Sequence, residues 1–145
     1  MDTIIEHLAN IRAFNRFYTN IIGLLDKHLL HSTYSLAEAR IIYEIYIGKN
    51  AQASQIMAAM NIDKSYLSRL LKKLEKEELI IKKPSGQDAR AMFISLTAKG
   101  LNEFDRLNKA SDEQISAMTA GLKASDQRQL VAHMNAIMNI LTKSR

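Results

Sequence analysis

The segment between Asp63 and Lys76 constrains the fold more than any other part of the chain, because it predicts a two-sided helix. One helix face collects leucines that lie three or four residues apart, namely Leu67, Leu70, Leu71 and Leu74. The other positions carry cations and hydroxyl groups, namely Lys64, Ser65, Tyr66, Ser68, Arg69, Lys72, Lys73 and Lys76. Residues 64–76 hold five Lys or Arg against one Glu, in a chain whose net charge is +5. One side of this helix is therefore expected to pack on a protein core, and the other suits a polyanion.

Two short strands are predicted directly after this helix. The first begins at Leu79, and the second alternates apolar residues with others from Met92 to Leu96. Between them Pro84-Ser85-Gly86 signals a turn, and the connection to Arg90 exceeds the usual hairpin loop of about 2 to 5 residues. An apolar helical segment, a tight connection, a basic helix and a hairpin follow in the order of a winged helix-turn-helix. On charge alone a solvated helix face would explain the cations equally well, and the hairpin favours nucleic-acid binding.

The basic helix divides into two parts if it enters the major groove of DNA. We expect Ser65, Tyr66, Ser68 and Arg69, in its first turns, to reach base edges, with Arg69 placed for a two-hydrogen-bond contact to guanine. Lys72, Lys73 and Lys76 lie further along and are expected to contact phosphates.

The hairpin tip places a carboxylate and a guanidinium two residues apart, in Asp88 and Arg90. The carboxylate can hold the arginine extended, and an extended arginine suits the narrow, negatively charged minor groove. We therefore expect Arg90 to contact the minor groove and Asp88 to hold it in place.

Two patterns resemble those of the MarR family of bacterial transcription regulators. One is Asp88-x-Arg90-x-x-x-Ile94-x-Leu96-Thr97-x-x-Gly100, and the other is Leu70-x-x-x-Leu74-Glu75-x-x-x-Leu79-Ile80. The resemblance implies a mainly α fold with a small β wing, flanked by long terminal helices that pair into a homodimer. It also implies transcriptional repression that small aromatic or phenolic ligands release. One departure is Glu78, where family members often have Gly; Glu78 predicts a strained or altered helix end.

The flanking segments agree with a helical dimerisation part. Ser35-x-x-Glu38 reads as a capping box that opens a second helix. The first helix and the last both carry more apolar surface than one neighbour would cover, which predicts a homodimer on a pseudo-palindromic duplex. We expect one domain over residues 1–145, with dimerisation helices over about 1–33 and 101–145 and the winged helix-turn-helix over about 34–100.

An effector site is expected near the first two helices, where most aromatic residues gather. Tyrosine hydroxyls beside arginines would give an apolar pocket with a few polar groups, built from Arg12, Arg16, Phe17, Arg40, Tyr43 and Tyr46. Core filling explains many of these aromatic residues equally well, with the face that contains Tyr46 packed inward. Arg40 could instead pair with Glu44 on the next turn.

Several classes of function find no support in the sequence. No nucleophile, phosphate-loop or metalloprotease motif occurs, and the chain has no Cys, so we expect no enzyme, cofactor or metal. No signal peptide or membrane span is visible, which favours the cytoplasm. Two alternatives stay open. One is a module that binds an acidic protein partner. The other is the regulatory part of a MarR-like acetyltransferase, because residues 11–18 resemble such modules.

Overall fold

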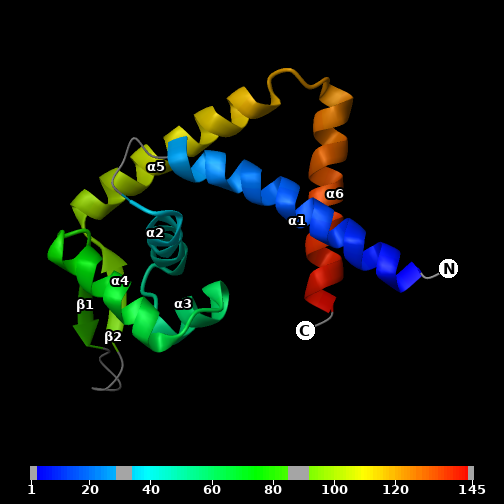
Figure 1. Ribbon diagram of the computed structural model, residues 1–145. Helices are drawn as coiled ribbons and strands as arrows, with labels where there is room; N and C mark the ends of the chain where they lie inside the picture. Colours follow the sequence, from blue (N-terminus) through cyan, green and yellow to red (C-terminus); the bar gives the residue numbers. More distant parts are fainter. Residues whose placement is uncertain (1–2, 29–33, 85–91, 144–145) are drawn as a thin grey trace. The chain divides into compact units, whose positions relative to one another are not determined.

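The structure is a computed structural model that describes residues 3–28, 34–84 and 92–143, with only the backbone described for residues 24–28. Its order of elements is α1 (Thr3–His28), α2 (Leu36–Gly48), α3 (Ala53–Met60), α4 (Lys64–Lys76), β1 (Ile80–Pro84), β2 (Met92–Leu96), α5 (Ala98–Thr119) and α6 (Ala124–Lys143) (Figure 1). The expected fold class, mainly α with a small β hairpin, is confirmed.

The chain divides into two compact units, one of residues 1–111 and the other of residues 112–145. Helix α5 continues across this division, so the first unit holds α1, the winged part and α5 up to residue 111. The domain boundaries expected from the sequence stay a prediction.

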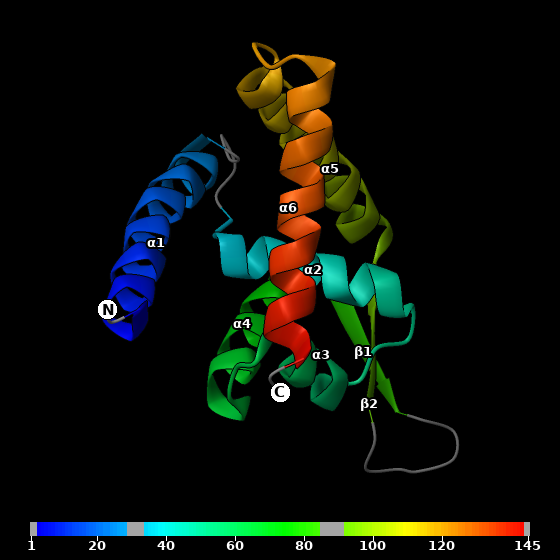
Figure 2. The same ribbon diagram turned by 90° about the vertical axis from the view of Figure 1, so that its right-hand side faces the viewer.

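The core of the first unit is formed by isoleucines and leucines from α2, α3, α4, the hairpin and α5. In Figures 1 and 2 the short helices α3 and α4 and the hairpin lie on the same side of α2. The residues buried between these elements are Ile41, Ile42, Ile45, Ile56, Leu67, Leu71, Leu74, Leu79, Ile80, Ile94 and Leu107. The apolar face predicted for the basic helix is thus confirmed, with Leu70 packed at the edge of the core.

Local hydrogen bonds set where the helices begin. Ser35 Oγ accepts from the Glu38 backbone N at 3.1 Å, and Glu38 Oε1 accepts from the Ser35 backbone N at 2.8 Å, which confirms the predicted capping box. Helix α4 begins after Asp63, whose carboxylate accepts from the Tyr66 backbone N at 2.7 Å. Asn61, in the left-handed conformation with φ 54°, ends α3 and provides the tight connection between α3 and α4.

The two strands form an antiparallel hairpin in which Ile80 is opposite Leu96 and Lys82 is opposite Ile94. Ala51 adds a bridge to this sheet, because its backbone N donates to Ile94 O at 3.1 Å and its O accepts from Ile94 N at 2.7 Å. Of the predicted inward positions of β2 only Ile94 is fully buried. Met92, opposite Pro84 at the end of the hairpin next to the connection between the strands, is 39% exposed.

The first and last helices differ from this core because their large apolar side chains are exposed. On α1 the exposed fraction is 72% for Ile5 and 63% for Phe17, and on α6 it is 63% for Ile140. Helix α6 has no buried residue among those described. The surplus of apolar surface expected at both ends of the chain is therefore present.

Candidate nucleic-acid interface

The outer face of α4 carries four polar residues that follow one another at helical spacing: Ser65, Arg69, Lys72 and Lys76. These four residues are called the α4 stripe below. They are all exposed, and they lie opposite the buried leucines of the same helix. Among the described residues none of the three cations of the stripe takes part in an ion pair. Their charge is therefore free to meet an anion.

Arg69 is oriented by an aromatic neighbour on its own helix. Its guanidinium carbon lies 5.6 Å from the centre of the Tyr66 ring, within the range of a cation–π contact. Tyr66 is itself half-buried, so the ring has fewer orientations than an exposed side chain would have. This contact favours one direction for the Arg69 guanidinium. That guanidinium is the group that we expect, from the sequence, to read a base.

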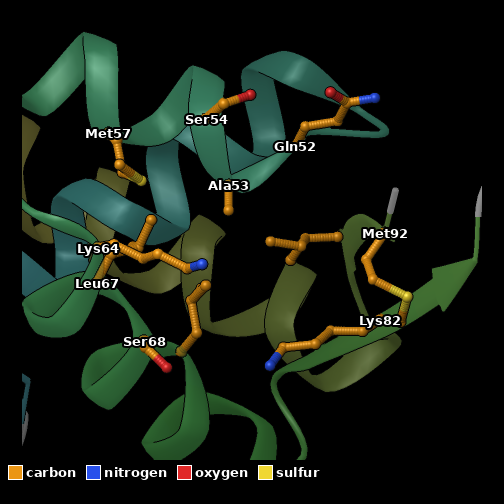
Figure 3. A pocket seen from close by; sticks show the side chains of 11 residues that line it. Gln52, Ala53, Ser54, Met57, Lys64, Leu67, Ser68, Lys82 and Met92 are labelled. Carbon is orange, nitrogen blue, oxygen red and sulfur yellow. The ribbon is translucent and has the colours of Figure 1, made fainter. Parts of the chain in front are cut away.

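The side of α4 that faces the hairpin forms a hollow of about 330 Å³ between α3, α4 and both strands. Figure 3 shows the side chains of Lys64, from α4, and Lys82, from β1, extending toward each other across it. Ser68 also lines the hollow, and Met57, Leu67 and Met92 provide apolar wall. Two ammonium groups at one opening strengthen the positive potential beside the α4 stripe.

Lys82 was not among the residues assigned to the interface from the sequence. Its ammonium is 3.7 Å from Glu75 Oε1, a distance that gives a weak ion pair at the surface. The signal that could have found Lys82 is the Lys82-Lys83 pair directly after the basic helix. The hairpin brings Lys82 back alongside that helix.

Lys73 is paired within the chain, so its assignment to phosphate stays a prediction that competes with this ion pair. Its Nζ is 2.7 Å from Glu38 Oε2, and the Glu38 side chain is 4% exposed. Burial alone would raise the pKa of Glu38, but hydrogen bonds from Lys73 and Ser35 outweigh it and lower that pKa below its ordinary value. The bond to Glu38 in turn raises the pKa of Lys73. Lys73 sits on the flank of α4, beside the α4 stripe but outside it.

The exit of α4 is joined to the start of α5 by hydrogen bonds. Thr97 Oγ1 donates to Glu78 O at 2.6 Å and accepts from Gly100 N at 3.0 Å, while the Thr97 backbone N donates to Leu79 O at 3.0 Å. Lys99 Nζ adds a bond to Glu77 O at 3.0 Å. A Cβ on Gly100 would lie 2.1 Å from Leu79 O, so this close approach requires glycine. These contacts give a physical role to the Thr97-x-x-Gly100 pattern.

Glu78 adopts the strained conformation that its place in the sequence predicts. Its φ is 63°, in the left-handed region where glycine carries no steric penalty. Among the described residues it is one of three non-glycine positions with positive φ, together with Lys49 and Asn61. The backbone after α4 therefore keeps the conformation that a glycine would adopt, and Glu78 carries the steric cost of it.

Asp88 and Arg90 lie outside the described residues, so the minor-groove contact stays a prediction.

The residues assigned to an effector site lie on two helices. Arg12, Arg16 and Phe17 are exposed on α1. On α2, Arg40 donates through Nε to Glu44 Oε2 at 2.7 Å and through an amino group to Ala59 O at 3.3 Å, which confirms the alternative of a salt bridge. Tyr43 is 45% exposed.

Tyr46 does not pack inward as expected, since it is 44% exposed. Its ring stacks on Phe104 of α5 with the centroids 4.0 Å apart. A hollow of about 400 Å³ next to this pair is lined by Ile45, Tyr46, Ile47, Lys49, Ser95, Leu96 and Leu101.

No described helix is long and apolar enough to cross a membrane. No group of three or more His, Cys, Asp or Glu side chains in the described ranges could hold a metal ion.

Comparisons with known proteins address the same winged part. The model of the MarR family matches residues 32–91. The HTH-type transcriptional regulator BilQ of Clostridium symbiosum is 28% identical over 92 residues, which are 62% of this chain and 64% of that regulator. BilQ of Clostridioides difficile is 23% identical over 111 residues, 75% of each chain.

Solved structures share the fold over most of the chain. FabT of Streptococcus pneumoniae in complex with DNA has a TM-score of 0.81 at 16% identity and covers 96% of this chain and 99% of its own. A mutant of MarR from E. coli complexed with operator DNA has a TM-score of 0.77 at 17% identity. The match covers 94% of this chain and 99% of the MarR chain. The family match over α2 to the hairpin and these shared folds agree with the two sequence patterns. Residues 32–91 thus match the MarR family of transcription regulators, and the chain has the winged helix-turn-helix fold of the solved MarR family structures.

Proposed function

We propose that the protein regulates transcription by binding double-stranded DNA in a sequence-specific way, with α4 as the recognition helix in the major groove. The observation that carries the proposal is the α4 stripe, in which a serine and three cations, none of them in an ion pair with a described residue, face outward on a helix held by buried leucines. The related structures of FabT and MarR were solved with DNA. We propose that the protein acts in the cytoplasm. The proposed function requires no catalysed reaction, cofactor or metal.

The contacts divide between reading and anchoring. Arg69, oriented by Tyr66, is assigned to a base edge, and Ser65 and Ser68 lie close enough along α4 to support it. Lys72 and Lys76 are assigned to phosphates, and Lys64 and Lys82 extend the positive surface toward the hairpin. Arg90 remains our candidate for the minor groove, with Asp88 as its holder.

Selection of bound sequences from random duplex DNA tests this proposal. We expect a pseudo-palindrome whose half-sites lie about 10 bp apart, because two copies related by two-fold symmetry read it. Arg69→Ala should cost roughly 1–3 kcal/mol and relax the preference at one base pair. Lys72→Ala should weaken all sequences alike and lower the salt dependence. Equal losses on every sequence for both variants would contradict the division of roles.

We also propose that the protein is a homodimer and a repressor released by a small aromatic or phenolic effector. The exposed apolar side chains of α1 and α6 support the dimer. Support for the effector is the family and the group of aromatic and basic residues named above, to which the hollow beside Tyr46 and Phe104 is added. Because coupling is reciprocal, an effector that weakens DNA binding must itself bind DNA-bound protein more weakly by the same factor. Equal effector affinities for free and DNA-bound protein would rule out this mechanism.

A further inference from the structure

Glu38 is a buried carboxylate at the start of α2, and the function proposed above leaves it without a role. The residue is 3% exposed. Oε1 accepts the Ser35 N–H at 2.8 Å, and Oε2 lies 2.7 Å from Lys73 Nζ. Among the described residues Oε2 has no hydrogen-bond partner of good geometry, so the Lys73 ammonium compensates it as an ion pair. Burying a carboxylate costs free energy unless its oxygens are compensated, so the position of this charge requires Lys73.

The pair joins two elements that are far apart in the sequence. Lys73 lies near the end of α4, one residue after Lys72 of the α4 stripe. Its side chain is about half exposed, at 49%, so solvent is available to it and yet it extends to Glu38. The ion pair of Arg40 and Glu44 is different, because both residues lie on α2; the link from Arg40 to α3 is its separate hydrogen bond to Ala59 O.

The ion pair can restrict rotation of α4 about its own axis, which the apolar contacts of its leucines cannot do. Leu67, Leu71 and Leu74 hold α4 to the core through apolar burial, which has no preferred direction and would tolerate small rotations of the helix about its axis. An ion pair joins two defined atoms, here Lys73 Nζ and Glu38 Oε2 at 2.7 Å, and the buried carboxylate cannot follow a rotation of α4. This ion pair on the flank of the helix therefore restricts how the α4 stripe faces outward.

We propose that Glu38 is a positioning residue for DNA binding, which fixes the orientation of α4 through Lys73, and that Lys73 does not contact phosphate. This inference rests on the proposed function, since it concerns the same recognition helix. It assigns a role in DNA affinity to a residue that lies behind the DNA-facing surface.

Glu38→Gln tests the inference because electrostatics alone predicts the opposite result. Removing a negative charge near a polyanion should tighten binding, whereas loss of the positioning bond should weaken it, by about tenfold. The matched control is Glu44→Gln, which removes the same charge from the same helix and should leave affinity unchanged or slightly tighter.

Lys73→Gln distinguishes positioning from phosphate contact through the salt dependence of DNA affinity. A lost phosphate contact lowers the slope of log affinity against log salt by about 0.9. We expect Lys73→Gln to weaken binding with the slope unchanged, and Lys72→Gln to lower the slope. Glu38→Gln combined with Lys73→Gln should bind about as weakly as either alone, and Lys73→Arg should retain most of the affinity. Because Lys73 is half exposed, its variants remain informative even where Glu38→Gln unfolds.

The possible results separate this inference from the proposed function. Tighter binding by Glu38→Gln, a lowered slope for Lys73→Gln, or additive losses in the double variant would overturn the positioning role while DNA binding itself stands. Failure of the unmodified protein to bind any selected duplex would overturn both proposals.

Discussion

The winged part buries its large apolar side chains within one chain, whereas the two terminal helices leave theirs exposed. Around α2, Ile41, Ile42 and Ile45 are fully buried within one chain. On α1 and α6, side chains of the same kind are exposed, as Ile5 and Ile140 show at 72% and 63%. Exposed patches of this kind on a small protein mark surfaces for association. The comparison shows that the winged part buries its apolar side chains within one chain, and it supports our proposal that the terminal helices associate with a second copy.

The largest loss of stability is expected where the winged part is joined to α5. Gly100→Ala would place a Cβ 2.1 Å from Leu79 O, and backbone on both sides of the contact would have to move. We expect the free energy of unfolding to fall by more than about 4 kcal/mol, enough to abolish the fold. The control is Gly121→Ala, where nothing lies within 4 Å of the added Cβ. Denaturant unfolding of both variants checks this, and equal stabilities would contradict the close packing.

Two isoleucine substitutions, one in the winged part and one on α1, test the comparison directly. Ile42→Ala should cost about 2–5 kcal/mol at any protein concentration, because it leaves a cavity in the core of one chain. Ile5→Ala removes a side chain that is 72% exposed, so its effect should depend on concentration and appear as weaker self-association. Thermal unfolding over a range of concentrations separates the two. Concentration-independent losses of similar size from both changes would break the comparison.

A smaller effect, of opposite sign, is expected at the end of α4. Glu78→Gly should raise the free energy of unfolding by about 1 kcal/mol, because glycine adopts φ 63° without the steric cost that glutamate bears. Glu77→Gly, next to it at φ −82°, gains no such relief and should destabilise the protein. A decrease in stability for Glu78→Gly would show that the glutamate side chain contributes more than its backbone costs.

The smallest effect concerns acid stability. Because the pKa of Glu38 is lowered in the folded protein, its contribution is fully present above the ordinary value of 4.5 and is lost as the pH falls through the folded pKa. Stability should therefore decrease below about pH 4.5, and part of this decrease should be absent in Glu38→Gln. Unfolding measured from pH 7 to pH 3 checks it. Identical profiles for the two proteins would show that Glu38 titrates normally.

Much of the fold could be predicted from local patterns. The leucine spacing of α4 and the capping box at Ser35 and Glu38 are local, and both are present in the structure. The strain at Glu78 also followed from one position. The pairing of Glu38 with Lys73 could not be predicted, because it depends on how α2 crosses α4. For the same reason the sequence missed Lys82, which only the hairpin brings beside α4, and placed Tyr46 inside the core although it stacks on Phe104 at the surface.

We propose that two copies, joined through the terminal helices, present two α4 stripes to one duplex. The most direct test is the mass of the complex with a selected pseudo-palindromic duplex at micromolar concentration, measured by light scattering. Our account predicts two chains per duplex, and Ile5→Ala should lower the fraction of that complex while each chain keeps its fold. One chain per duplex with undiminished affinity would contradict the account.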